Sequence, residues 1–295
     1  MQRYPAWLKQ SFSPDDTAGQ VRGLVSDLRL VTVCESAVCP NLRECYSQRQ
    51  LTFMILGGTC TRSCRFCAVD NGRPEPVAAD EPWRVAEAVS RLQLRHAVIT
   101  SVARDDLQDE GAGHFVDVLR VVRERNPGLT VEVLVPDFHG RSELIRRVVC
   151  DGHPEIFAHN VETIARLSPL LRPQADYRRS LDVLRQAASL GGGCLIKSSL
   201  MVGLGESLEE VQQLLQDLAE ACVTHLTVGQ YLRPDAGHLP VQEYVSPQRF
   251  ALYERMAYDT GFQWVKSGPF VRSSYHAVDA VDALAAARNH RMATV

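Results

Sequence analysis

Short apolar runs alternate with amphipathic helical segments along most of this chain. The runs cover residues 51–56, 96–101, 130–135, 155–158, 194–202 and 225–228. Each is followed by a polar loop and a stretch with helical spacing, which predicts strand-then-helix units in a parallel sheet with right-handed crossovers. Six such units are too few to close an eight-stranded barrel, so we expect an α/β fold of the partial (β/α)6 TIM-type barrel kind.

The predicted units divide the chain into three parts. Residues 51–245 form the barrel core, residues 1–50 an N-terminal extension and residues 246–295 a C-terminal extension. Helical spacing also predicts a helix over residues 161–170 and a closing helix from Asp279 to Arg288. Polar residues gather after the predicted strands, so we expect the active site at the carboxyl edge of the sheet.

Composition narrows the class of protein. Hydrophobic residues make up 45% of the 295 residues and charged residues 23%, which is typical of a chain with a sizeable buried core. The formal net charge of -3 does not indicate a basic surface for nucleic acid. No apolar run approaches the roughly 18 residues that span a bilayer. The first residues lack the apolar core of a secretory signal, so we expect a cytoplasmic protein that binds neither nucleic acid nor membrane.

Six of the nine cysteines lie between residues 34 and 67, in two triplets. The first triplet is Cys34, Cys39 and Cys45, and the second is Cys60, Cys64 and Cys67. Clustered thiols in a reducing compartment indicate metal binding or catalysis rather than disulfides. Structural zinc usually takes four ligands, whereas an iron-sulfur cluster with three protein thiolates keeps one iron open for another ligand.

The second triplet has the spacing CxxxCxxC directly after the first long strand and resembles the radical S-adenosylmethionine (radical SAM) superfamily. The resemblance implies that Cys60, Cys64 and Cys67 hold a [4Fe-4S] cluster whose open iron chelates SAM. Reductive cleavage of SAM then gives a 5′-deoxyadenosyl radical that abstracts hydrogen from an unactivated carbon. The three cysteines are therefore predicted catalytic residues and metal ligands.

The first triplet, in the phrase CESAVCPNLRECY, resembles the lipoyl synthase family, and further phrases of that family recur in order. They include TFMILGGTCTRSCRFCAV, HNVET, LMVGLGES, LTVGQYLRP and GPFVRSSYHA. The resemblance implies insertion of two sulfur atoms, at carbons 6 and 8 of a protein-bound octanoyl-lysine. It also implies that an auxiliary [4Fe-4S] cluster, held by Cys34, Cys39, Cys45 and a serine of the RSSY phrase, donates the sulfur.

We assign Ser274 as that fourth, catalytic ligand, with Ser273 as the alternative. A serine oxygen is a harder ligand than a thiolate, which suits a cluster that must be dismantled. The ligand lies more than two hundred residues from the first triplet, so both extensions are expected to close over the barrel mouth. Arg272 is expected to support the auxiliary cluster or the substrate.

SAM presents a carboxylate, an ammonium and ribose hydroxyls, so charged and amide groups must line its site. Lys197, at a predicted strand end, is expected to meet the SAM carboxylate, and Asn160 and Glu162 the ribose. Arg104 is expected to bind the cofactor by ordering the loop around it.

The resemblance implies three partners besides SAM and two [4Fe-4S] clusters. They are an octanoylated carrier domain of a 2-oxoacid dehydrogenase E2 or glycine cleavage H protein, an electron donor such as flavodoxin or ferredoxin, and an iron-sulfur cluster carrier. Two other readings stay open. One is another radical SAM sulfur-inserting enzyme, similar to biotin synthase or to tRNA methylthiotransferases, and the other is a zinc or electron-transfer protein.

Overall fold

The computed structural model describes residues 4–8, 16–191, 193–275 and 277. One mixed sheet organises them, with eight strands in chain order. The strands are β1 (Val31–Thr32), β2 (Thr52–Ile55), β3 (His96–Ser101), β4 (Thr130–Leu134), β5 (Ile156–Ala158), β6 (Leu195–Val202), β7 (His225–Gln230) and β8 (Trp264–Gly268). β1 runs antiparallel to β2, and every later pair is parallel. The predicted α/β partial barrel is confirmed, and the two edge strands β1 and β8 lie outside the six predicted strand-then-helix units.

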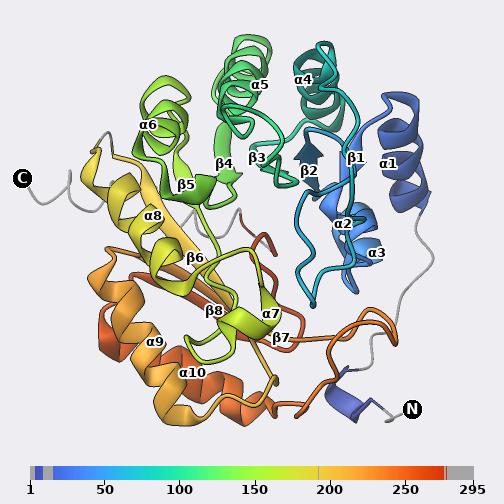
Figure 1. Ribbon diagram of the computed structural model, residues 1–295. Helices are drawn as coiled ribbons and strands as arrows, with labels where there is room; N and C mark the ends of the chain where they lie inside the picture. The colour runs from blue at the N-terminus through green and yellow to red at the C-terminus, as the bar shows by residue number, and fades with distance from the viewer. Residues whose placement is uncertain (1–3, 9–15, 192, 276, 278–295) are drawn as a thin grey trace, which may run out of the picture.

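Helices connect consecutive parallel strands and line the outside of the curved sheet (Figure 1). The longer ones are α4 (Glu81–Leu92), α5 (Ala112–Arg125), α8 (Tyr177–Ser189), α9 (Leu208–Glu220) and α10 (Pro247–Thr260). Helix α6 (Ser142–Arg146) continues as one π-helical turn, η3 (Arg147–Asp151). The remaining helical elements are the 12-residue α1 (Asp16–Asp27) and the short η1 (Ala6–Leu8), α2 (Val33–Ser36), α3 (Leu42–Ser47), η2 (Phe138–Gly140) and α7 (Ser168–Leu171).

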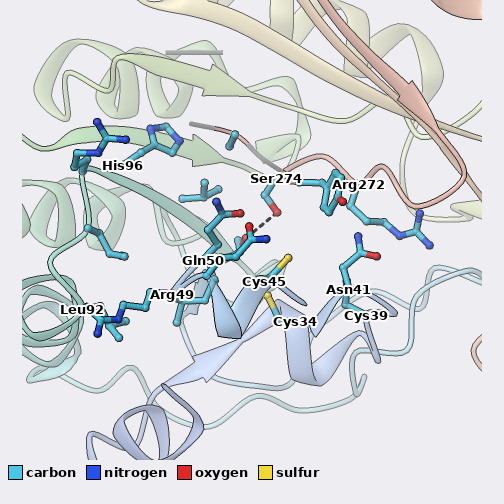
Figure 2. A pocket seen from close by; sticks show the side chains of 18 of the residues that line it. Cys34, Cys39, Asn41, Cys45, Arg49, Gln50, Leu92, His96, Arg272 and Ser274 are labelled. Carbon is cyan, nitrogen blue, oxygen red and sulfur yellow. Dashed lines mark hydrogen bonds between the residues drawn. The ribbon is translucent and has the colours of Figure 1, made fainter. Parts of the chain in front are cut away.

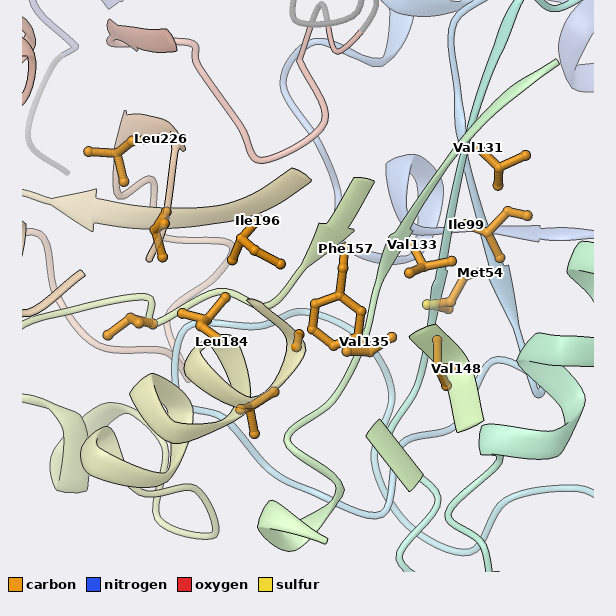
Figure 3. Packing of buried hydrophobic residues seen from close by; sticks show 14 of the residues in the cluster. Met54, Ile99, Val131, Val133, Val135, Val148, Phe157, Leu184, Ile196 and Leu226 are labelled. Carbon is orange, nitrogen blue, oxygen red and sulfur yellow. The ribbon is translucent and has the colours of Figure 1, made fainter. Parts of the chain in front are cut away.

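The strands are apolar because both of their faces are covered. Helices pack against the outer face, and side chains of neighbouring strands fill the interior (Figure 3). Val131, Val133, Phe157, Ile196 and Leu226 are all at most 4% exposed. Burying one such side chain stabilises the fold by about 1.5–3 kcal/mol, so this core holds the strand ends, and the loops that follow them, in place.

The gap between the sheet edges β1 and β8 is bridged by the two extensions. The N-terminal extension supplies α2 and α3, and the C-terminal extension supplies the segment after β8. Asn41 Nδ2 donates to the Phe270 carbonyl at 2.6 Å, and the Tyr275 hydroxyl donates to Glu44 Oε1 at 3.0 Å. The first cysteine triplet therefore lies beside the RSSY phrase, as its predicted role requires.

The predicted helix over residues 161–170 is wrong for most of its length. Glu162 forms an isolated bridge with Leu200, donating its N–H to the Ser199 carbonyl at 3.0 Å and accepting from the Met201 N–H at 2.8 Å. These bonds extend the sheet into the loop, so only α7 remains helical. The predicted helix from Asp279 to Arg288 lies outside the described residues. Within the described part of the chain, no helix is both long enough and apolar enough to cross a membrane.

Candidate active site

The loop that carries Cys60, Cys64 and Cys67 is fixed by its neighbours. The Thr61 N–H donates to the Ala103 carbonyl at 3.1 Å, and the Arg65 N–H donates to the Leu171 carbonyl at 2.8 Å. Cys60 Sγ accepts from the N–H groups of Ala103 and Arg62, at 3.3 and 3.4 Å. The backbone therefore presents a sulfur ligand that is already hydrogen-bonded, as thiolate ligands of iron-sulfur clusters are.

Arg62, between two of the cysteines, ties this loop to the barrel. Its guanidinium contacts Asp105 after β3 at 2.7 Å and Asp137 after β4 at 2.7 Å. Burial raises the pKa of the Asp137 carboxyl, but the charge of Arg62, together with that of His159 and the hydrogen bonds from Arg62 and the His139 N–H, holds that pKa below its usual value. The sequence analysis missed Arg62, although its place inside the CTRSC phrase was a signal.

Cys60, Cys64 and Cys67 line a cavity of about 220 Å³ together with His159, Asn160, Glu162 and Arg172. Burial and the charge of Cys67 raise the pKa of the Cys64 thiol to about 12, and burial raises that of Cys67 to about 11. Thiolates so placed need a positive group to stabilise them. The donor set therefore fits an iron-sulfur cluster held by three soft ligands.

Three buried polar atoms on this cavity have no hydrogen-bond partner among the described residues. They are His159 Nε2, Asn160 Oδ1 and Arg172 Nε. An unpaired buried polar atom costs about 1–3 kcal/mol, so these atoms indicate a polar ligand that pairs with them. A SAM molecule, with its carboxylate, ammonium and hydroxyl groups, fits this set.

The predicted cofactor residues Asn160 and Glu162 are adjacent in the cavity. Asn160 Nδ2 donates to Glu162 Oε1 at 3.0 Å. Glu162 has a left-handed backbone with φ of +69°, a strained conformation that the bridge to β6 maintains. Burial raises the pKa of the Glu162 carboxyl, and the charge of Arg172 opposes this.

Arg172, which the sequence analysis also missed, is a buried cation that lines the same cavity as Asn160 and Glu162. It is 4% exposed and donates from Nη1 to the Asn160 carbonyl at 3.1 Å. Burial lowers its pKa, while the charges of Glu162 and Cys64 raise it. No pattern in the sequence marked it, because it stands alone after the short helix α7.

Lys197 does not lie where the sequence analysis expected it. Its ammonium contacts Glu132 Oε1 at 2.8 Å, and both side chains are 1% exposed. It occupies the third position of β6, opposite the first residue of β7, whereas the cysteine cavity lies beyond the carboxyl ends of the strands. The structure therefore does not support a contact between Lys197 and SAM.

Arg104 orders the neighbouring loop rather than lining the cysteine cavity. Its Nη1 donates to the Leu56 carbonyl at 3.1 Å, and Nε and Nη2 bind Asp106 at 2.8 Å. This geometry supports the loop-ordering part of the prediction. Direct contact with the cofactor is not supported, because Arg104 is absent from the residues that line the cavity.

The first triplet lies at the other side of the gap between the sheet edges. Cys34 belongs to α2, Cys45 to α3, and Cys39 to the turn between them. All three line a cavity of about 290 Å³ with Arg272 and Ser274 (Figure 2). Burial raises the pKa of Cys34 to about 11, and burial with the charges of Cys34 and Cys39 raises that of Cys45 to about 12. The thiols of the first triplet therefore also suit a metal cluster, whose iron ions would stabilise their thiolate forms.

Ser274 faces the first triplet and accepts a hydrogen bond at 2.7 Å from Thr52 Oγ1 (Figure 2). A bond donated to the serine oxygen favours its alkoxide form, which is the form that binds iron. Ser273 lines only the larger cavity described below, whereas Ser274 lines both. The geometry favours Ser274 over Ser273.

Gly229 at the end of β7 lets the C-terminal segment approach closely. A Cβ on this residue would lie 2.1 Å from the Val271 carbonyl oxygen, closer than real Cβ atoms come. Arg272, which follows Val271, is partly buried; this burial lowers its pKa, and the charge of Cys39 opposes that shift. Arg272 thus places a cation against the first triplet, in agreement with a supporting role.

A third cavity, of about 400 Å³, joins the two triplets. It is lined by Cys34, Cys39 and Ser274 on one side and by Cys67, Asn160 and Glu162 on the other. Its remaining wall is largely apolar, with Phe66, Leu134, Leu200, Met201, Tyr231 and Val271. An apolar ligand in this cavity would lie between the two sets of cysteines.

Comparison with known proteins agrees with this geometry. Residues 54–218 match the radical SAM superfamily. The lipoyl synthase of Rubrobacter xylanophilus is 52% identical over 92% of this chain and 85% of its own length. That of Caldanaerobacter subterraneus is 50% identical over 93% of this chain and 96% of its own length. The chain belongs to the lipoyl synthase family.

Solved structures support the fold. SuiB of Streptococcus suis bound to S-adenosylmethionine has a TM-score of 0.56 at 11% identity, covering 77% of this chain and 54% of its own. HydG, a maturase of the [FeFe]-hydrogenase, has a TM-score of 0.57 at 16% identity, covering 90% and 70%. Family membership makes this chain a radical SAM enzyme whose cofactors are SAM and [4Fe-4S] clusters.

Proposed function

We propose that this chain inserts two sulfur atoms, at carbons 6 and 8, into an octanoyl chain amide-linked to a lysine of a carrier domain. The observation that carries the proposal is the largely apolar cavity of about 400 Å³ that is lined by Cys34 and Cys39 of the first triplet and by Cys67 of the second. A saturated acyl chain suits its wall, and the cavity places that chain between a site for radical generation and a site for sulfur donation.

On this proposal, Cys60, Cys64 and Cys67 hold the cluster that binds SAM. When bound there, this pair supplies one-electron cleavage of SAM and a carbon radical able to take hydrogen from the acyl chain. The protein binds and orients SAM and the acyl chain, and it excludes water from them. Arg172 pairs with the SAM carboxylate, Asn160 Oδ1 and His159 Nε2 pair with its other polar groups, and the Arg62 ion pairs keep the cysteine loop in register.

Cys34, Cys39, Cys45 and Ser274 hold the auxiliary cluster that donates sulfur. Three soft thiolates retain the cluster, while the harder serine oxygen is the ligand that releases iron most readily. Thr52 holds Ser274 by its hydroxyl bond, and Arg272 offsets the negative charge of the thiolates. The N-terminal extension (1–50) and C-terminal extension (246–295) thus complete a site that the core (51–245) lacks.

The carrier domain is that of a 2-oxoacid dehydrogenase E2 or a glycine cleavage H protein, because these proteins bear the lipoyl-lysine. A flavodoxin or ferredoxin supplies the electrons, an iron-sulfur cluster carrier is the source of iron and sulfide for rebuilding the auxiliary cluster, and the reaction takes place in the cytoplasm.

The proposal is tested by anaerobic turnover with SAM, a reductant and an octanoylated lysine peptide, followed by mass spectrometry. We expect about two 5′-deoxyadenosines per peptide and a product that carries two added sulfur atoms. Formation of 5′-deoxyadenosine without a dithiolated peptide would exclude this substrate. Stoichiometric zinc in place of iron would exclude radical SAM chemistry altogether.

A further inference from the structure

The first triplet is reached from two sides. On one side, Cys34 and Cys39 line the cavity that they share with Cys67, at the carboxyl ends of the strands. On the other side it lines the cavity of about 290 Å³, which extends to residues 48–50 before β2 and residues 93–96 before and at the start of β3. Segments that precede parallel strands meet at the opposite edge of the sheet. We call this second space the strand-start cavity.

The strand-start cavity reaches the surface and carries positive charge. Gln48, Arg49, Gln93 and Arg95 on its rim are exposed. Among the described residues, neither the Arg49 nor the Arg95 guanidinium has an ion-pair or hydrogen-bond partner. Arg272 adds a third guanidinium where the cavity meets Cys39. Among the described residues that line the cavity none is acidic, so the field at its rim favours an anion.

His96 provides a buried polar group inside the same cavity. Its side chain is 5% exposed; Nε2 lies 3.4 Å from Glu132 Oε2, and Nδ1 has no hydrogen-bond partner in the described part of the chain. Figure 2 places His96 and Leu92 at one end of the space and the sulfur atoms of Cys34 and Cys45 towards the other. Gln50 lies between these ends and offers amide donors to a passing anion.

We propose that the strand-start cavity is the binding and entry site through which hydrosulfide anion reaches the first triplet. This inference rests on the proposed function, in which the first triplet loses sulfur to the substrate. Substrate and SAM occupy the other side, so replacement through that side must wait until both have left. Entry from the strand-start side brings sulfide past the Arg49 and Arg95 guanidinium groups to Cys34 and Cys45, with the Arg272 guanidinium at the inner end, and entry itself involves no covalent step.

The test isolates each cluster site in a full-length chain. A variant with Cys60→Ala, Cys64→Ala and Cys67→Ala reports the first triplet alone, and a variant with Cys34→Ala, Cys39→Ala and Cys45→Ala reports the second. Each is stripped of iron and then supplied with saturating ferrous iron and varied sodium sulfide under argon. The rate of return of iron-sulfur absorbance gives a rate constant with respect to hydrosulfide, without any turnover.

Arg49→Glu combined with Arg95→Glu reverses the charge of the rim. We expect the rate constant for the first triplet to fall about tenfold at low salt, since focused fields change ion on-rates by 10-fold or more. The difference should shrink above 0.1 M salt, where charges are screened beyond about 10 Å. The second triplet should fill at its original rate. Gln50→Glu, which places the charge inside the cavity, should slow the first triplet further.

Arg255→Glu on α10 is the matched control, because Arg255 is exposed and does not line the cavity. Equal rates in the Arg49/Arg95 variant and this control would overturn the inference, as would equal slowing of both triplets. A first triplet that binds no cluster even with both arginines intact would instead overturn the proposed function. The two failures are therefore distinct.

Discussion

Lys197→Met should destabilise the fold and leave SAM binding intact. Lys197 and Glu132 are each 1% exposed, and their charged atoms lie 2.8 Å apart. Removing the lysine leaves a buried carboxylate whose one remaining ion-pair contact among the described residues is with His96, at 3.4 Å. Breaking a buried pair in this way costs about 3–5 kcal/mol, which is a large part of the about 5–15 kcal/mol that stabilises a typical protein.

The double variant Lys197→Met with Glu132→Leu is the control. It removes both charges and fills the space with apolar atoms, so most of the lost free energy of unfolding should return. Urea denaturation measures the stability of parent, single and double variants, and equilibrium binding measures their affinity for SAM. If Lys197→Met kept the stability of the parent but bound SAM tenfold more weakly, the lysine would be a cofactor ligand and our placement would be wrong.

Three further predictions concern the segment after β8 and the buried His225. Ser274→Ala should lower the iron content from about eight to about four per chain and abolish sulfur transfer while SAM cleavage persists; two intact clusters with normal transfer would refute the assignment. Gly229→Ala should also lose the first cluster, because its Cβ would displace Val271, and an iron count near eight would argue against that close approach. Burial and the charge of Lys197 lower the pKa of His225 from 6.5 to about 4. Between these values the unfolded chain binds more protons than the folded chain, so stability decreases as the pH is lowered across that window. Between pH 8 and pH 5 the loss from this residue is about 2 kcal/mol, and urea denaturation of His225→Gln should show a smaller pH dependence than the parent; identical pH dependence would contradict the shift.

The sequence alone predicted most of the fold, because the barrel strands are short apolar runs with polar loops after them. It also predicted that the RSSY phrase returns to the first triplet, and the bonds from Asn41 to Phe270 and from Tyr275 to Glu44 make that contact. The helix over residues 161–170 failed for a physical reason. The backbone of Glu162 pairs with β6, and no local pattern encodes a bond to a strand nearly forty residues away.

The environment of single charged side chains was much harder to predict. Nearly all of β6 is buried, so alternation of apolar and polar residues gave no sign of where Lys197 lies. Its partner Glu132 is two strands away in the sheet and 65 residues away in sequence. Arg172 was missed for the same reason, since its value as a buried cation depends on Glu162 and Cys64, which only the folded chain brings near it.

The central claim is that the first triplet and Ser274 hold a cluster that is consumed as the sulfur source. It is tested most directly by rebuilding both clusters with ³⁴S-sulfide, removing free sulfide, and allowing one turnover with octanoylated peptide. The account predicts a product in which both inserted sulfur atoms are ³⁴S, with loss of the first cluster and retention of the second. Unlabelled sulfur in the product, or a first cluster that stays intact after both insertions, would contradict it.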